Sequence, residues 1–348
     1  MRLRRARTIF IYWKTGKLVF ENFRTKTAIT AVPLSTQILD FFDRWRQPEQ
    51  FFLEMPQYSQ ASVRAALEEL TKYSMLVKEG SSDARQDSLL ARVWSAWLPY
   101  GSFHFGSKDV RFALEDRRKP RLRPGLAKAL QPPFFKTYRG AHRLTLPPRP
   151  VPGSEFPRVL LRRKTYREFS PGHLPLDAVS SLLFYTWGVM GYLSTSFGRL
   201  PQKTSPSGGA RHPGEVYLMA LRVEALAPGL YHYNPRRHTL ASLCTGEMES
   251  KAVEYCAGQA FVSQAGALFL MTAVLPRSIW KYRFARAYRV VLLDAGHLCQ
   301  TFCLTATWLG LAPFCTAALK DSLIEKDLGI DGISEVVLYV AGVGNMRR

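Results

Sequence analysis

Alternating apolar and polar positions near the N-terminus predict β-strands. The run TIFIYWKTGKLVFENF, residues 8–23, alternates on both sides of Thr15 and Gly16, a pair suited to a tight turn. A further extended piece reaches residue 32. The sequence therefore predicts a hairpin followed by a third extended segment.

Three short helices are expected next. Ser35 is the candidate N-cap of STQILDFFDRW, Pro48 opens PEQFFLEM, and Ser59 or Ser62 caps the third helix. Apolar residues recur at helical spacing in the third helix: Val63, Ala66, Leu67, Leu70, Tyr73 and Leu76. Strands combined with three short helices predict a winged-helix-like module.

The second half of the chain alternates helix and strand patterns. From Arg158 the pattern predicts helix, loop and helix, EVYLMAL predicts a strand, and GLYHYNPRRHTL predicts a hairpin. The apolar density from Val290 to Leu311 predicts a fully buried helix, as at the centre of a large core or a dimer. EVVLYVAGVGNMRR predicts a closing strand.

Residues 116–152 lose this periodicity and are basic and rich in proline, as in DRRKPRLRPG and TLPPRPVPG. Proline at this density prevents long helices and central strands. A chain of 348 residues also exceeds what one compact core usually holds. We therefore expect a domain over residues 1–115, a connector over residues 116–152 and a second domain over residues 153–348.

The charge is basic and uneven along the chain. Forty-eight Lys and Arg against 27 Asp and Glu give a net charge of +21, of which residues 1–150 carry +14 (27 against 13). Such an excess favours anionic partners. The third predicted helix, which would enter a DNA groove, carries Glu68 and Glu69 beside Lys72, so a peptide-binding or scaffolding role is favoured over nucleic-acid binding.

The cysteine count and the apolar runs indicate the compartment. Five cysteines, an odd number in a large chain, favour reduced thiols and a cytoplasmic location. The apolar run near the N-terminus is too short for a signal peptide, and no run of about 18 apolar residues predicts a membrane span. Cys299 and Cys303 share a helix face near His297, but an apolar context favours packing, so no metal site is expected.

Two loops in the second half are candidates for binding chemistry. Arg162, Arg163, Lys164 and Arg167 crowd one loop around Thr165, and such cations repel one another unless an anion such as phosphate lies between them. A solvated basic turn is the alternative. In the other loop, Pro206, Ser207, Gly208 and Gly209 permit a tight backbone path near a flat ligand, although the loop lacks the P-loop pattern.

The stretch WKYRFARAYR, residues 280–289, holds four cations and four aromatic residues. Taken alone, it suits a nucleic-acid surface, an ordinary helix face, or a place where a proton is moved. Lys281 and Tyr282 are the candidates for the last of these roles.

Taken in order, the motifs of the second half resemble those of the nitroreductase-like flavoenzymes, and among these the SagB-type dehydrogenases, which oxidise azoline rings in ribosomal peptides. The matching motifs are RRKTYREF, PSGGARHP with the strand after it, GLYHYNP, KY ahead of RAYR, LLDAGHLCQ, and LGID with EVVLYVAGVG. They extend from about residue 155 to the C-terminus. The first half, including YGSFHFGSKD at residues 100–109, is more loosely similar to the winged-helix-like, peptide-clamp region often fused to these enzymes.

The resemblance implies an α+β fold of three layers, α/β/α, around an antiparallel sheet, with central helices that form a homodimer and FMN held between the subunits. The residues implied in holding the phosphate, ribityl chain and ring edge are Arg163, Lys164, Thr165 and Arg167, with Arg347 or Arg348 of the other subunit completing the phosphate site. Those implied in lining the ring, from the other subunit, are Pro206, Ser207, Gly208 and Gly209. Amides near Ala317 and Ala318 would face the flavin, although the family usually has glycine there.

The resemblance also assigns Lys281 and Tyr282 to azoline oxidation. Lys281 would take a proton in its neutral form, which burial and cations such as Arg283 and Arg286 favour. Tyr282 would relay a proton or orient the ring. The expected partners are an azoline-bearing precursor peptide and a cyclodehydratase. Two alternatives stay open: an FMN-dependent NAD(P)H nitro or quinone reductase or small-metabolite dehydrogenase, and a flavin-free scaffold or nucleic-acid-binding protein.

Overall fold

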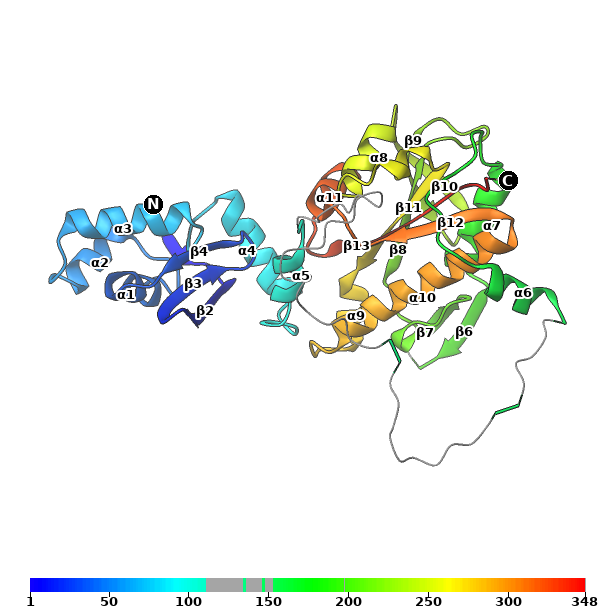
Figure 1. The fold of residues 1–348 in the computed structure, drawn as a ribbon. Coiled ribbons are helices and arrows are strands. Elements are labelled where there is room, and N and C mark those ends of the chain that lie inside the picture. The colour runs from blue at the N-terminus through cyan, green and yellow to red at the C-terminus, as the bar shows by residue number, and fades with distance from the viewer. Residues whose placement is uncertain (111–133, 136–145, 148–152, 197, 348) are drawn as a thin grey trace.

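The structure, a computed structural model, describes residues 1–110, 134–135, 146–147, 153–196 and 198–347. The predicted connector, residues 116–152, and Arg348 therefore fall almost wholly outside the described residues. Figure 1 shows two groups of elements, one at each end of the molecule, with α4 and α5 between them.

The N-terminal group combines a three-stranded antiparallel sheet, in the order β2-β3-β4, with a short β1–β5 pair and three helices. Thr15 and Gly16 have positive φ values of 47° and 75°, which confirms the predicted hairpin turn. Phe20, Ile38 and Phe42 lie at the centre of its apolar core. The elements are β1 (Leu3–Arg5), β2 (Ile9–Lys14), β3 (Lys17–Asn22), β4 (Thr27–Thr30), α1 (Pro33–Phe41), α2 (Pro48–Glu54), α3 (Gln60–Lys72), β5 (Leu76–Lys78), α4 (Ser82–Val93) and α5 (Ser102–Ser107).

Two of the three predicted helix starts are confirmed. Pro48 is the first residue of α2, and the Ser59 side chain caps α3 by accepting the Ser62 amide. The expectation for Ser35 is wrong, because α1 already begins at Pro33 and Ser35 is its third residue. Proline is well suited to the first helical position, since its fixed φ is helical and its missing N–H would have had no partner there.

The C-terminal group is built on a six-stranded sheet in the order β10-β9-β8-β11-β13-β12, in which every neighbouring pair is antiparallel. The predicted hairpin is formed by β9 and β10, and EVYLMAL lies in β8 except for its last residue, Leu221. A separate hairpin, β6–β7, precedes β8. The strands are β6 (Gly191–Thr195), β7 (Gly198–Gln202), β8 (Gly214–Ala220), β9 (Gly229–Asn234), β10 (Thr239–Thr245), β11 (Ala267–Val274), β12 (Leu311–Thr316) and β13 (Glu335–Asn345).

Helices cover both faces of this sheet. Successive side chains of a strand point to opposite faces, so Phe269 of β11 packs in the core beneath α7 and α10, whereas Leu268 and Leu270 pack toward α8 and α11. The fold is therefore the expected three-layer α+β arrangement (Figure 1). The helices are α6 (Glu155–Arg162), α7 (Leu176–Trp187), α8 (Glu249–Tyr255), α9 (Leu275–Lys281), α10 (Ala287–Trp308) and α11 (Asp321–Leu328), with short 3-10 turns at Gly208–Ala210 and Ala260–Gln264.

The expectation of a fully buried helix between Val290 and Leu311 is wrong for the single chain. One face of α10 is buried in the core, but Leu293 is 55% exposed and Trp308 is 44% exposed on the other face. The pattern misled because both faces are apolar. By length and composition α10 could also cross a membrane, but its buried face packs on the sheet as a core helix does.

The end of the N-terminal group packs directly on the C-terminal group. Trp94, Trp97 and Phe105 share one apolar core with Leu275 and Val336. A buried ion pair also joins the two groups, with Lys108 Nζ 2.6 Å from Oε2 of Glu325 of α11.

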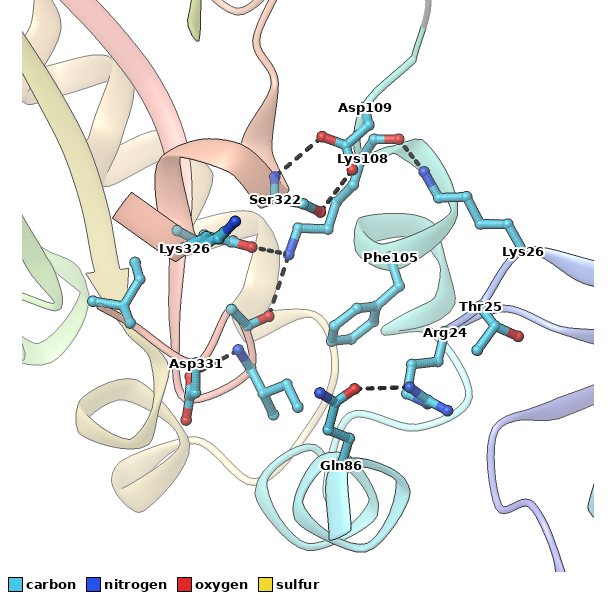
Figure 2. A pocket seen from close by; sticks show the side chains of 14 residues that line it. Arg24, Thr25, Lys26, Gln86, Phe105, Lys108, Asp109, Ser322, Lys326 and Asp331 are labelled. Atoms are coloured by element: carbon cyan, nitrogen blue, oxygen red, sulfur yellow. Dashed lines mark hydrogen bonds and ion pairs between the residues drawn. The ribbon is translucent and has the colours of Figure 1, made fainter. Parts of the chain in front are cut away.

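A cleft of about 610 Å³ lies at this joint (Figure 2). Arg24 and Lys26 line it from the N-terminal group, and Lys326 lines it from α11. Asp109 accepts hydrogen bonds from the amide and hydroxyl of Ser322 across the joint. The cleft is therefore bounded by both groups and carries several cations.

Candidate active site

The glycine-rich loop between β7 and β8 is held to the N-terminal half of α10. Ser207 Oγ donates to Asp294 Oδ2 at 2.5 Å, and the Gly208 amide donates to Asp294 Oδ1 at 3.4 Å. The amide of His212 donates in turn to Ser207 Oγ at 2.9 Å. Burial raises the pKa of Asp294, while the hydrogen bond from Ser207 opposes that shift. The loop path is thus fixed by one buried carboxyl group.

Gly209 brings this loop against Lys281 and Tyr282. Its φ is +60°, in the left-handed region that favours glycine. An idealised Cβ on Gly209 would lie 2.8 Å from Lys281 Nζ and closer still to Tyr282 Oη. The fold therefore brings the two predicted catalytic residues, Lys281 and Tyr282, next to the loop of residues 207–209. Pro206, the preceding residue of this loop, is exposed. Together with Asp294, these residues, 206–209 and 281–282, are called the KY half-site below.

The turn that carries Tyr282 rests on aromatic residues of the N-terminal group. Trp97 Nε1 donates to the Tyr282 carbonyl at 3.1 Å. His104 Nδ1 lies 2.7 Å from Tyr288 Oη, and its ring stacks on Trp94. Burial, with the charge of Lys108 acting in the same direction, lowers the pKa of His104 to about 3. His104 is therefore neutral at physiological pH, in an apolar layer directly beneath the KY half-site.

Charged groups surround the outer end of the glycine-rich loop. Burial lowers the pKa of Lys203, with Arg277 acting in the same direction and Glu215 opposing it. Burial also lowers the pKa of His212, to about 4. Arg277 pairs with Glu215 at 2.5 Å and donates to the His212 carbonyl at 3.2 Å. Lys203 is thus a largely buried lysine in this loop whose neutral form is favoured.

The basic loop after α6 is built differently. Lys164, Thr165 and Arg167 are exposed and Arg163 is half-buried. Within the described residues no carboxylate lies in ion-pair range of these three cations. Lys164 instead lies over the Tyr166 ring at 4.9 Å. Arg163, Lys164, Thr165 and Arg167, with Arg347, are called the cation half-site below.

Backbone contacts hold the cation half-site against the sheet. The Tyr166 amide donates to the Pro313 carbonyl of β12 at 2.9 Å. Arg347, after β13, pairs with Glu168 at 2.9 Å, which brings the C-terminal segment to the same loop. The structure therefore places Arg347 beside the predicted phosphate-binding cations of its own chain.

The turn after β12 carries Ala317, which is exposed, and Ala318, which is half-buried. The Ala318 amide donates to Thr316 Oγ1 at 3.1 Å, and Gln259 Nε2 donates to the same hydroxyl at 2.8 Å. Strand β12 also holds the cation loop through the Pro313 carbonyl. The turn of Ala317 and Ala318 therefore follows the same strand that holds the cation loop. Of the two amides expected to face the flavin, that of Ala318 already has an acceptor within the turn.

The two half-sites lie apart within one chain. Asp294 belongs to the KY half-site and Cys303 lies near Arg163, and the two residues are nine positions apart along α10, or about 14 Å of rise. Within the described residues no hydrogen bond, ion pair or ring contact joins the half-sites. A ligand that touches both would need either that length or a contribution from a second subunit.

Three cysteines meet between α10 and β12. The Sγ atoms of Cys299, Cys303 and Cys315 all lie within 4.8 Å of one another. Hydrogen bonds from the thiols of Cys299 and Cys303 lower the pKa of Cys315. His297, by contrast, is exposed and is not part of this cluster.

Comparison with known proteins identifies the class. The family model described as the nitroreductase family matches residues 160–345, more than half of the chain. The chain therefore belongs to the nitroreductase family.

Individual relatives are similar over the same region. The chain is 32% identical over 170 residues to the trifolitoxin-processing protein TfxB of Rhizobium leguminosarum bv. trifolii, which covers 47% of this chain and 46% of TfxB. It is 31% identical to the putative nitroreductase MJ1384 of Methanocaldococcus jannaschii, over 49% of this chain and 83% of that protein. It is 27% identical to the microcin B17-processing protein McbC of Escherichia coli, over 41% of this chain and 54% of McbC. The chain thus spans less than half of the length of TfxB. The matches to the family model, TfxB and McbC confirm the resemblance to SagB-type members of the family.

Several residues of the site could not be identified from the sequence as contributors to it. Asp294 was visible only as part of LLDAGH, and nothing local linked it to Ser207. Trp97 and Lys203 lie in segments without a catalytic pattern, and Cys315 is separated from Cys303 by the end of a helix. Their roles depend on contacts between segments that are far apart in the sequence.

Proposed function

We propose that the protein is an FMN-dependent dehydrogenase that oxidises thiazoline or oxazoline rings in a ribosomally made peptide. The observation that carries this proposal is the placement of Lys281 and Tyr282 against Gly209. Membership of the nitroreductase family supports oxidoreductase chemistry. The names of TfxB and McbC, processing proteins of trifolitoxin and microcin B17, support a peptide substrate.

The donor groups of the two half-sites fit FMN. Arg163, Lys164 and Arg167, which have no carboxylate partner within the described residues, suit a phosphate, which Arg grips with paired hydrogen bonds. In this proposal Arg163, Lys164, Thr165 and Arg167 hold the phosphate, ribityl chain and ring edge, and Arg347 completes the phosphate site. Residues 206–209 line the ring, and the backbone at residues 317–318 faces it.

A homodimer explains how two separated half-sites serve one cofactor. The exposed face of α10 carries Leu292, Leu293 and Trp308, and α6 adds Phe156 and Leu161. Exposed apolar area on this scale marks an interaction surface. We propose that this face pairs two subunits, so that residues 206–209 of one subunit meet the cation half-site of the other.

Ring oxidation to an azole removes one hydride and one proton. FMN, when bound, supplies the hydride acceptor. Lys281 takes the proton at Nζ, and Tyr282 Oη, which flanks the same glycine, orients the ring or relays the proton. The carbonyl of Tyr282 is held by Trp97, so the N-terminal group fixes the turn on which both groups depend.

An aromatic cavity adjoins the turn that carries these residues. This cavity of about 400 Å³, within the size range of ligand pockets, is lined by Trp97, whose indole N–H donates to the Tyr282 carbonyl. Aromatic rings and two arginines line it: Trp94, Trp97, Tyr100, Phe103, Tyr288, Arg286 and Arg289. We propose that peptide residues flanking the azoline enter this cavity. The N-terminal domain, residues 1–115, would bind the peptide, joined through the connector, residues 116–152, to the dehydrogenase domain, residues 153–348.

The experiment uses the purified full chain, FMN and a synthetic azoline-bearing peptide. We expect the peptide to lose two hydrogen atoms per ring by mass spectrometry. Lys281→Ala should lower the rate by about 10²- to 10⁴-fold, the usual contribution of a general base. Bound FMN with no change in peptide mass would overturn the proposed reaction.

Lys203→Ala is the matched control, because Lys203 is the other lysine near the loop and its pKa is lowered by burial. It should leave ring oxidation within a few fold of the wild-type rate. If Lys203→Ala abolishes oxidation while Lys281→Ala does not, the proton acceptor has been assigned to the wrong lysine.

The similarity to MJ1384, over 83% of that putative nitroreductase, favours a second candidate function. In that case the protein reduces nitro compounds or quinones with NAD(P)H. Rapid bleaching of bound FMN by NADPH, together with indifference to Lys281→Ala, would favour this function. A cyclodehydratase partner would then have no role.

A further inference from the structure

The three-cysteine cluster is formed by two segments that meet only in the folded chain. Cys299 and Cys303 lie one turn apart on α10, and Cys315 lies on β12. All three Sγ atoms are within 4.8 Å of one another. Cys299 and Cys303 are 4% and 5% exposed, and Cys315 is half-buried. The cluster is thus shielded from solvent but not sealed.

This spacing suits a metal ion. Zn–S bonds of about 2.3 Å in tetrahedral geometry place neighbouring sulfurs about 3.8 Å apart, so small side-chain rotations would close the cluster around an ion. Thiolates are soft ligands, which select zinc and monovalent copper over hard cations. Cys299 and Cys303 lie on one turn of α10, and Cys315 lies on the adjoining strand β12. The three sulfurs would therefore bind the ion on one side and leave its other side open to a fourth ligand.

The surroundings of the cluster supply what three thiolates need. Tyr339 Oη lies 3.1 Å from Cys315 Sγ, where it or a water can complete a fourth position. Arg163 interacts electrostatically with Cys303 and Cys315, and its charge offsets the net negative charge of three thiolates around a divalent ion.

Another buried cysteine shows what simple packing looks like in this protein. Cys256 is fully buried and packs among apolar residues of α8, β11 and α11. No other sulfur belongs to a metal-binding group with it in the part of the chain that the structure describes. Convergence of three thiols is therefore not the usual outcome of burying a cysteine in this fold.

We propose that Cys299, Cys303 and Cys315 bind one thiophilic d¹⁰ metal ion, Zn²⁺ in the first instance. Binding releases the thiol protons and forms three Zn–S bonds. The ion ties α10 to β12, the strand that anchors the cation loop through Pro313 and ends at the turn of Ala317. Its role is structural, and the proposal does not depend on the reaction catalysed.

The test counts metal in the intact protein. The full chain, purified under reducing conditions, is incubated with Zn²⁺, freed of excess ion, and analysed by native mass spectrometry and elemental analysis. We expect one Zn²⁺ per chain, and loss of that ion in Cys303→Ser and in Cys315→Ser. Cys256→Ser, which removes a buried thiol outside the cluster, should retain the ion.

A measurement on the wild type guards against variants that fail to fold. Co²⁺ in place of Zn²⁺ should give intense sulfur-to-cobalt charge-transfer absorption in the protein prepared without FMN, and added Zn²⁺ should abolish it. A wild-type chain that retains no Zn²⁺ and gives no such absorption overturns the proposal. So does a chain in which two of these cysteines form a disulfide while reductant restores no metal binding.

Discussion

The KY half-site and the cation half-site belong to the same domain but are stabilised in opposite ways. In the KY half-site, Asp294 accepts hydrogen bonds from the glycine-rich loop, and Gly209 leaves room for the side chains of Lys281 and Tyr282. Trp97 donates a hydrogen bond to the turn that carries Tyr282. In the cation half-site, Arg163, Lys164 and Arg167 have no carboxylate partner among the described residues. In the KY half-site, folding alone therefore supplies the hydrogen-bond partners of the loop. In the cation half-site, the positive charges repel one another until an anion binds between them.

This difference predicts where stability and ligand affinity separate. Substitutions in the KY half-site should lower the free energy of unfolding, because they break interactions already made. Substitutions in the cation half-site should leave folding unchanged and weaken ligand binding. The predictions below test that separation.

The largest effect is expected from Arg163→Ala combined with Arg167→Ala. Loss of two charge-assisted contacts should cost about 3 kcal/mol or more, or at least ~100-fold in FMN affinity by fluorescence titration. The free energy of unfolding without FMN should stay within about 0.5 kcal/mol of wild type.

The matched control is Arg236→Ala with Arg237→Ala, which removes the same charge from the exposed β9–β10 turn. Its FMN affinity should change little. Equal losses in both double variants would mean that overall charge, rather than the cation half-site, attracts the flavin.

Asp294→Ala should act on stability. It leaves the half-buried Ser207 hydroxyl and the Gly208 amide without their acceptor, at a cost of about 1 to 3 kcal/mol in urea denaturation. Adding Ser207→Ala should cost less in the Asp294→Ala variant than in the wild type, because the hydrogen bond between Ser207 and Asp294 is then already lost. Strictly additive losses would show that Asp294 does not act through Ser207.

His104 predicts a pH dependence of the layer under the KY half-site. Its folded pKa, about 3, is below the ordinary 6.5, so the unfolded chain binds the proton first. The contribution of neutral His104 to the free energy of unfolding is fully present above about pH 6.5, and it is lost progressively as the pH falls toward 3. Between pH 7 and pH 5 the loss should be about 2 kcal/mol in urea denaturation.

His104→Gln should flatten that part of the pH profile, since glutamine does not titrate. His297→Gln, which removes an exposed histidine on α10, should keep the wild-type slope. A slope that survives in His104→Gln would assign the pH dependence to other groups.

Gly209→Ala and Gly16→Ala should each cost about 1 kcal/mol, because both positions have positive φ. Nothing lies within 4 Å of a Cβ at Gly16, whereas Gly209 faces Lys281 and Tyr282. Only Gly209→Ala should therefore also lower ring oxidation, as measured by peptide mass. Equal oxidation by both variants would show that the contact at Gly209 is not needed.

Local elements were predictable because their causes are local. Thr15 and Gly16 set the turn, and Pro48 and Ser59 set helix starts, through backbone angles and hydrogen bonds to near neighbours. Ser35 failed since a proline two residues earlier competes for the same helix end. The order of motifs was sufficient to recognise the family.

The same sequence determined the residue types of the site without determining how they meet. The cation loop is visible as a charge cluster wherever it folds. Gly209 and Lys281, by contrast, are 72 residues apart, and Trp97 reaches Tyr282 from another domain. The sequence also gave no sign that β12 would bring Cys315 to Cys299 and Cys303.

Element type and charge follow from each residue and its near neighbours, so the sequence alone predicted the first hairpin, strands β8, β9, β10 and β13, two of the three proposed helix starts, the basic loop and the family. The packing of distant segments on one sheet decided the rest. It determined which face of α10 is buried, which lysines lie by the glycine-rich loop, and which thiols converge. Packing depends on the combined shape of all these segments, and no single stretch of sequence contains that information.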